Sequence, residues 1–147
     1  MDYQSLKLDS QLCFPLYAVS RKITKLYRPI LNRLGLTYTK YVAMMALWEK
    51  DDVSVKELGN RLYLDSGTLT PLLKSLERQG LIERKRNPED ERNLIISLTN
   101  KGIQLKDKAI KVPEEISSCI DIPPQDAKEL HRILYLILRQ DNKRNCD

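Results

Sequence analysis

The segment from Ser54 to Leu98 restricts the fold of this chain more than any other part of the sequence. Ser54 and Glu57 have the spacing of a capping box, in which each side chain accepts a hydrogen bond from a free backbone N–H of the other residue. A second helix start follows, because Asp65 or Ser66 can cap the next stretch of apolar residues at helical spacing. The pattern predicts two consecutive helices joined by a short turn.

A β-hairpin is predicted directly after the second helix, which Gly80 is expected to end. Residues 81–86 and 94–98 have the composition of strands, and the latter stretch is apolar at every second position. Residues 87–93, N-P-E-D-E-R-N, form a charged tip between them. Helix, turn, helix and hairpin in this order make a winged helix-turn-helix. We therefore expect a mainly α fold (α+β winged helix-turn-helix) whose DNA-binding core covers residues 37–98.

One side of the second helix carries short hydroxyls and cations that can face outward. Such side chains suit base edges and phosphates in the major groove of DNA, which is about 12 Å wide. Each part also has a simpler interpretation, since an amphipathic helix can merely pack and a charged tip is usually a solvated loop. The ordered combination, in a chain with 25 Lys and Arg against 20 Asp and Glu, favours DNA binding. The outward-facing residues are Ser66, Thr68, Thr70, Pro71, Lys74 and Arg78.

A long helical segment precedes this core at residues 9–34, where apolar residues recur at steps of three or four. Pro15 fits best in a first helical turn, which places the helix start close to Cys13. Pro29 is expected to kink or split the helix, and Gly35 to close the segment. The sequence thus predicts one long amino-terminal helix with a proline in its second half.

After the hairpin, Thr99 is expected to cap a helix that runs through about Cys119 and is bent by Pro113. A last helix is predicted at residues 127–139. These carboxy-terminal helices and the amino-terminal helix carry more apolar surface than the core needs.

We therefore expect a single winged-helix protein over residues 1–147, with residues 9–34 and 99–140 as dimerisation helices. A two-fold homodimer would place two reading helices about 34 Å apart, which matches the half-sites of a pseudo-palindromic double-stranded DNA operator.

Other function classes are disfavoured by what the sequence lacks. No run of about 18 apolar residues exists to span a membrane, and the amino end has no signal-peptide pattern, so we expect a cytoplasmic protein. Cys13, Cys119 and Cys146 follow no metal-ligand spacing, and His131 is the only histidine. There is no glycine-rich phosphate loop. We expect no enzyme, no metal and no cofactor.

Four motifs carry a family resemblance: Q-L-C-F at residues 11–14, L-T-Y-T at 36–39, L-D-S-G-T-L-T-P-L-L-K at 64–74 and D-E-R at 90–92. Over nearly its whole length the chain resembles the MarR family of winged-helix repressors, and especially the organic-hydroperoxide-sensing OhrR branch. The resemblance implies a redox-sensing regulator that binds inverted-repeat DNA as a homodimer and is released when organic hydroperoxide oxidises Cys13.

Carried over residue by residue, the resemblance implies DNA contacts at the hairpin and on the second helix. Arg92 would be the wing arginine that enters the minor groove, held in place by Asp90. A narrow minor groove concentrates negative potential, which favours an inserted guanidinium. On the second helix the implied DNA-facing residues are Asp65, Ser66, Thr68, Thr70, Pro71 and Lys74.

The resemblance also implies a redox site. Cys13 matches the peroxide-reactive cysteine, and Tyr27 and Tyr38 match tyrosines whose hydroxyls reach that sulfur from the partner subunit. Tyr17 matches a nearby aromatic residue, whereas Pro15 departs from the family pattern. From the residues alone, Cys13 is either a thiol activated near a helix start or an inert buried cysteine.

The thiol that would complete the oxidation stays open at this point. Cys119 is the favoured partner, although its helical spacing from Ile116 and Ile120 also fits a sulfur that fills a dimer core. Cys146 or an external small thiol are the alternatives.

Two other functions also remain open. One is a MarR-type repressor released by a small aromatic or lipophilic ligand in a pocket between the dimer and DNA-binding regions. The other is a thiol peroxidase that uses Cys13, against which the lack of a supporting His or Arg motif speaks.

Overall fold

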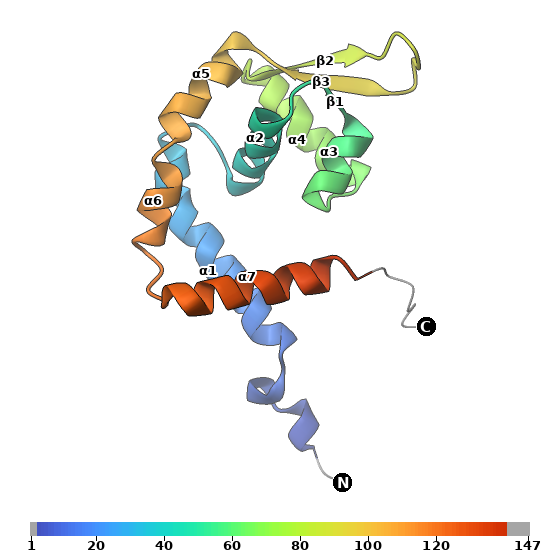
Figure 1. Ribbon diagram of the computed structural model, residues 1–147. Coiled ribbons are helices and arrows are strands. Elements are labelled where there is room, and N and C mark those ends of the chain that lie inside the picture. The colour runs from blue at the N-terminus through green and yellow to red at the C-terminus, as the bar shows by residue number, and fades with distance from the viewer. Residues whose placement is uncertain (1–2, 141–147) are drawn as a thin grey trace. The chain divides into compact units, whose positions relative to one another are not determined.

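Local signals in the sequence determine most of the element boundaries in the computed structural model, which describes residues 3–140. Two short 3-10 helices, Gln4–Leu6 and Leu8–Ser10, lead into a mainly helical fold. The remaining elements, labelled in Figure 1, are α1 (Cys13–Asn32), α2 (Tyr38–Glu49), β1 (Val53–Ser54), α3 (Val55–Leu62), α4 (Ser66–Arg78), β2 (Ile82–Arg86), β3 (Leu94–Leu98), α5 (Asn100–Ala109), α6 (Val112–Ser117) and α7 (Pro124–Leu138).

Helix α1 begins at Cys13, as predicted, and holds Pro15 in its first turn. Pro29 lies inside the helix without splitting it, so that half of the prediction is wrong. Gly35 follows the helix with a φ of 68°, the left-handed backbone that glycine adopts without strain. The amino-terminal helix is therefore a single rod of 20 residues.

The first helix of the helix-turn-helix is capped by only one half of the predicted capping box. Ser54 Oγ accepts a hydrogen bond from the Glu57 backbone N–H at 3.0 Å. The Glu57 carboxylate turns instead to Lys50, whose Nζ lies 2.6 Å from Glu57 Oε1. A lysine at the end of α2 thus competes successfully with the backbone for this side chain.

The cap of α4 is Asp65 and not Ser66, because Asp65 Oδ1 accepts from the Thr68 N–H at 2.7 Å. The other end of α4 closes as predicted at Gly80, whose φ is 71°. There the Leu81 N–H donates back to the carbonyl of Leu76 at 3.1 Å.

A three-stranded antiparallel sheet in the order β1-β3-β2 confirms the predicted hairpin and adds one strand to it. In the hairpin, Ile82 pairs with Leu98 and Arg86 with Leu94. Strand β1, which the sequence analysis did not predict, pairs Val53 with Ile96 on the other edge of β3. We call β2, β3 and the tip between them, residues 82–98, the wing.

The predicted helix from Thr99 to Cys119 is two helices, and this expectation was wrong. Helix α5 ends at Ala109, and α6 starts only at Val112. Pro113 has no N–H to donate to the carbonyl of Ala109, so a continuous helix would lose that bond at this point. As a result Cys119 lies in a turn beyond α6 and not on a helix.

The core is formed by one apolar face from each helix of the winged domain and by the central strand. Ile96 in β3 and Leu76 in α4 are fully buried, whereas Leu72, predicted on the same stripe of α4, is half-buried. Trp48 in α2, expected in the core, is half-buried and donates its indole N–H to the Gly102 carbonyl at 2.9 Å. Other buried core residues include Leu31, Met44, Leu47, Leu58, Leu69, Leu73 and Ile82.

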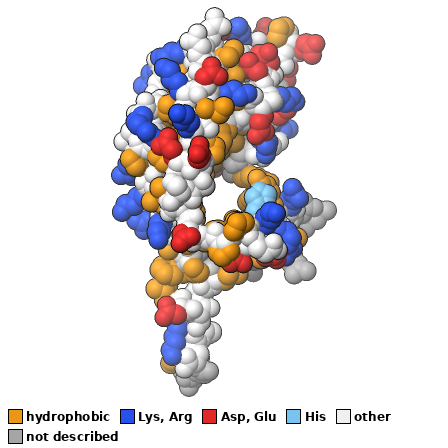
Figure 2. Space-filling view, turned by 60° about the vertical axis from the view of Figure 1, so that its left-hand side comes forward, with side chains coloured by type: hydrophobic (Ala, Val, Ile, Leu, Met, Phe, Trp, Pro, Cys, Tyr) orange, Lys and Arg blue, Asp and Glu red, His pale blue; other side chains and the backbone are white. Residues whose placement is uncertain are grey.

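The chain divides into two units, Met1–Ile116 and Ser117–Asp147. Hydrophobic side chains are exposed at the surface of this single chain (Figure 2). In the first unit they cluster at the amino-terminal end, where Leu12 is 73% exposed and Tyr17 60%. In the second unit α7 has no buried residue, and Leu130, Ile133 and Ile137 lie exposed along it. Among residues 3–140 no helix has the length and hydropathy that a membrane span requires.

Candidate nucleic-acid interface and redox site

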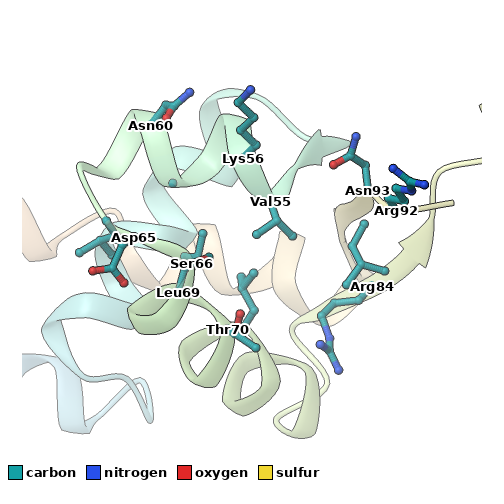
Figure 3. Close-up of a pocket in the computed structure, with 14 residues that line it drawn as sticks. Val55, Lys56, Asn60, Asp65, Ser66, Leu69, Thr70, Arg84, Arg92 and Asn93 are labelled. Carbon is teal, nitrogen blue, oxygen red and sulfur yellow. The ribbon is translucent and has the colours of Figure 1, made fainter. Parts of the chain in front are cut away.

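A groove with a volume of about 440 Å³ lies between α3, α4 and the wing. Figure 3 shows side chains from these three elements converging on it. Of the residues predicted to face DNA, Asp65, Ser66, Thr70 and Arg92 line this groove. The other predicted residues lie outside it but are all exposed: Thr68, Pro71, Lys74, Arg78 and Asp90.

The hydroxyl groups at the start of α4 are presented by the cap at Asp65. Hydrogen bonds from Thr68, first from its backbone N–H and then from its side chain, keep the pKa of the Asp65 carboxyl below its usual value. The carboxylate therefore stays ionised at neutral pH, where an anion is also favourable beside the free N–H groups of a helix start. Asp65 positions Ser66 and Thr70 on an exposed first turn more than it offers a contact to phosphate.

The wing tip is held in shape by Asp90, which accepts hydrogen bonds from the backbone of Arg92 and from the side chain of Asn93. Asp90 Oδ1 accepts from the Arg92 N–H at 3.1 Å, and Asp90 Oδ2 accepts from Asn93 Nδ2 at 2.8 Å. The predicted support of Arg92 by Asp90 thus acts on the main chain. Within residues 3–140 no ion pair involves the Arg92 guanidinium, which leaves it available to a phosphate-rich partner.

Four polar residues of the groove were missed by the sequence analysis: Lys56, Asn60, Arg84 and Asn93. Arg84 is the most constrained of them, because its Nη2 and Nε lie 2.7 Å and 2.9 Å from Glu77 Oε2 in α4. The sequence did contain a signal for Arg84. Side chains alternate between the two faces of a strand, so Arg84 lies on the same face of β2 as Ile82, which is buried.

The predicted thiol-supporting tyrosines meet in an aromatic cluster between α1 and α2. The ring centroids of Tyr27 and Tyr38 are 4.8 Å apart, and those of Tyr27 and Tyr41 are 6.0 Å apart. Burial first, and then the neighbouring Tyr38 and Tyr41, raise the pKa of Tyr27 to about 12. Burial also raises the pKa of Tyr38. All three hydroxyls are therefore neutral donors at physiological pH.

Cys13 is an exposed free thiol at the first position of α1, so within a single chain it is not the buried cysteine considered from sequence. The preceding residue, Leu12, provides no side-chain cap to this helix start. Tyr17 lies one turn further, where its hydroxyl accepts from Arg21 Nη1 at 3.5 Å. Tyr27 is 14 residues beyond Cys13, or about 21 Å along the helix, so the cluster does not reach the thiol of its own chain.

Cys119 is exposed in its turn after α6, and so it does not fill the core of this single chain. Cys146, the alternative second thiol, lies outside the described residues.

Helix α4 with its exposed polar face, the charged wing and the groove between them define a winged helix-turn-helix transcriptional regulator. Known proteins agree with this class. The family model described as transcriptional regulator SarA/Rot matches residues 25–109. The organic hydroperoxide resistance transcriptional regulator of Bacillus subtilis is 48% identical over 143 residues, which cover 97% of each chain. The chain belongs to the MarR family of winged helix-turn-helix regulators, in the OhrR-like branch.

Solved structures of AbfR, a protein of Staphylococcus epidermidis, share the fold. Reduced AbfR bound to DNA is 38% identical with a TM-score of 0.77, and covers 95% of this chain and 97% of its own. Disulfide-formed AbfR is 39% identical with a TM-score of 0.65, and covers 92% and 96%.

Proposed function

We propose that this regulator binds inverted-repeat DNA as a homodimer and releases it when an organic hydroperoxide oxidises Cys13. The redox part of the proposal rests on the distance within one chain between the Cys13 thiol and the tyrosine hydroxyls that would support it. Cys13 stands exposed at one end of α1, and the tyrosine hydroxyl donors lie about 21 Å further along the same helix. A second copy that brings its Tyr27 and Tyr38 to Cys13 completes the site.

The exposed apolar surface supports the dimer. Leu12 before α1, Leu16 and Val19 on α1, and Leu130 and Ile137 on α7 are exposed in a single chain, where their contact with water is unfavourable. The names of relatives support the redox switch, since AbfR has been solved both reduced on DNA and with a disulfide.

The chemistry of the switch balances with the hydroperoxide as oxidant. The Cys13 thiolate attacks the terminal peroxide oxygen, the O–O bond breaks, and the alcohol leaves with a proton. The sulfur becomes a sulfenic acid, oxidised by two electrons. A second thiol then displaces water to form a disulfide. Either product alters the contacts of a dimer-lining helix end, and only such a difference between states can change DNA affinity.

The alternative release by an aromatic or lipophilic ligand has less support. A hollow of about 310 Å³ lies between the end of α1, the end of α4 and α5. Its lining mixes the apolar side chains of three leucines with cations and amides, so it does not single out an apolar ligand; these residues are Leu34, Leu81, Leu105, Arg33, Gln79, Lys101, Gln104 and Lys108.

The redox proposal is tested with Cys13→Ser. We expect this protein to bind operator DNA like the parent, because the exposed sulfur makes no contact that the fold needs, and to remain bound after cumene hydroperoxide is added. The measurement is fluorescence anisotropy of a labelled duplex before and after oxidant. Peroxide release of the Cys13→Ser protein would contradict the proposal.

The DNA part is tested with Arg92→Ala. Binding should weaken by roughly ten-fold or more, and the slope of log K against log salt should fall by about one. The melting temperature should stay the same within about 2 °C, since the side chain is exposed. Lys85→Ala is the matched control: it removes a wing cation that pairs with Glu83 at 3.0 Å and lies outside the groove. If Arg92→Ala binds as tightly as Lys85→Ala, the wing does not contact DNA.

A further inference from the structure

An ion pair connects the wing to helix α4. Arg84, in the middle of β2, directs Nη2 and Nε to the same oxygen of Glu77 in the last turn of α4, at 2.7 Å and 2.9 Å. The two side chains are only 22% and 37% exposed. Figure 3 shows Arg84 reaching from the wing toward α4 at the floor of the groove. Two charge-assisted bonds to one oxygen fix both direction and distance.

No second ion pair within residues 3–140 joins these two elements. Lys85 pairs with Glu83 inside β2, and Asp90 bonds only within the tip. Opposite Arg84 in the ladder is Ile96, which is fully buried and anchors β3 in the core. The pair therefore sits where the anchored part of the hairpin ends and the projecting part begins.

The projecting part acts as a lever. Arg92 lies four residues from Ile96, or about 13 Å of strand, so a rotation of about 10° at the pair moves the tip by roughly 2 Å. The minor groove is only about 6 Å wide, and a displacement of this size removes an inserted guanidinium from its place.

We propose that Arg84 is a positioning residue for DNA binding, which holds the wing at a fixed angle to α4 through Glu77. The pair lets Arg92 and the α4 face engage one half-site together. This inference rests on the proposed DNA-binding function. It differs from a direct contact between Arg84 and phosphate, in which Glu77 would only compete for the guanidinium.

The sign of the effect of Glu77→Gln separates these cases. The substitution removes a negative charge near polyanionic DNA and frees Arg84, so simple electrostatics and direct contact both predict equal or tighter binding. Positioning predicts binding several-fold weaker. Glu49→Gln is the matched control, because it removes a carboxylate from another surface pair, with Arg61 at 2.8 Å, away from the groove. This control should bind within two-fold of the parent.

A double-mutant cycle completes the test, with operator affinity measured by anisotropy and folding by circular dichroism. Arg84→Leu, which keeps an apolar stem on the groove floor, should weaken binding about ten-fold. In that background Arg92→Ala should weaken DNA binding by less than a further three-fold, because the wing no longer holds a fixed angle to α4. Glu77→Gln retains the shape of its side chain, so it decides the question if Arg84→Leu proves unstable.

Two results would overturn the inference alone. Binding by Glu77→Gln as tight as by Glu49→Gln is one, and a full effect of Arg92→Ala in the Arg84→Leu background is the other. An Arg92→Ala protein that binds normally with Glu77 and Arg84 intact would refute the wing contact itself and this inference with it. Weakening by Arg92→Ala without weakening by Glu77→Gln would refute the positioning role alone.

Discussion

Gly102, in the first turn of α5, is the position where the fold tolerates a side chain least. A Cβ added there would lie 2.1 Å from the carbonyl oxygen of Leu81, and 3.1 Å from its carbon. Real Cβ contacts stay beyond 3.0 Å, so α5 and the residue before β2 would have to separate by about 0.9 Å. The obstacle is backbone on both sides, and no rotamer change relieves it.

This separation would also weaken hydrogen bonds at the contact between α5 and Leu81. Leu81 O accepts from the Thr99 N–H at 3.1 Å, and Gly102 O accepts from Trp48 Nε1 at 2.9 Å. Overpacking costs about 1–3 kcal/mol and each weakened bond about 1 kcal/mol, while alanine regains about 1 kcal/mol of helix propensity. Gly102→Ala should thus lose about 2–4 kcal/mol of unfolding free energy.

Thermal unfolding followed by circular dichroism measures this loss. At about 2–4 °C per kcal/mol for a chain of this size, the melting temperature should fall by about 4–16 °C. Protein concentration must be fixed, because an oligomer melts at a concentration-dependent temperature. Trp48 is the only tryptophan and bonds to Gly102, so its fluorescence emission reports directly on the contact between α5 and Leu81.

The matched control is Gly67→Ala in the first turn of α4. There the nearest atom to an added Cβ is the movable Asp65 Oδ1 at 3.3 Å, so alanine should be neutral or stabilise by up to about 1 kcal/mol. If Gly102→Ala melts within 2 °C of the parent, the inferred close packing of α5 against Leu81 is wrong.

Two further predictions concern the cap of α4 and the second thiol. Because the folded pKa of Asp65 lies below its unfolded value of about 3.8, the stability from this carboxylate is complete above that pH and declines as pH falls through the folded pKa. The stability difference between the parent and Asp65→Asn should therefore stay constant down to about pH 5 and shrink as the pH falls through about 4 toward about 2 in urea titrations. For the second thiol, peroxide-treated protein should run as a covalent dimer without reductant. Cys119→Ser should abolish that species and Cys146→Ser retain it; the reverse pattern would assign the role to Cys146, and no covalent dimer at all would indicate a small external thiol.

The elements that the sequence predicted correctly are those specified by neighbouring residues. The caps at Ser54, Asp65 and Thr99, and the ends at Gly35 and Gly80, all depend on bonds within a few positions. Such signals are complete in a short window, so no knowledge of the tertiary fold was required.

The errors arise where distant parts of the chain meet. Strand β1 has only two residues and exists because Ile96, more than 40 positions away, pairs with Val53. The turn before it is set by Asp51, whose Oδ1 accepts from the Leu98 N–H at 2.8 Å. Arg84 was missed for a different reason, because its partner Glu77 is only seven positions away and the strand alternation that points to Arg84 was not used.

The proposed sensor is the part that is hardest to predict from the sequence, because a second copy of the chain would complete its site. A raised pKa, about 12 for Tyr27, keeps the cluster hydroxyls protonated at any physiological pH, so toward sulfur they act as donors. In the proposed site these hydroxyls would donate to the Cys13 sulfur, and its oxidation to a sulfenic acid or a disulfide would change the group that they bind. Since Cys13 and Tyr27 stand about 21 Å apart on one rigid helix, this exchange requires two chains that place α1 against its copy. In the proposed homodimer a change at that contact would act on both subunits at once, and the two α4 helices would respond together.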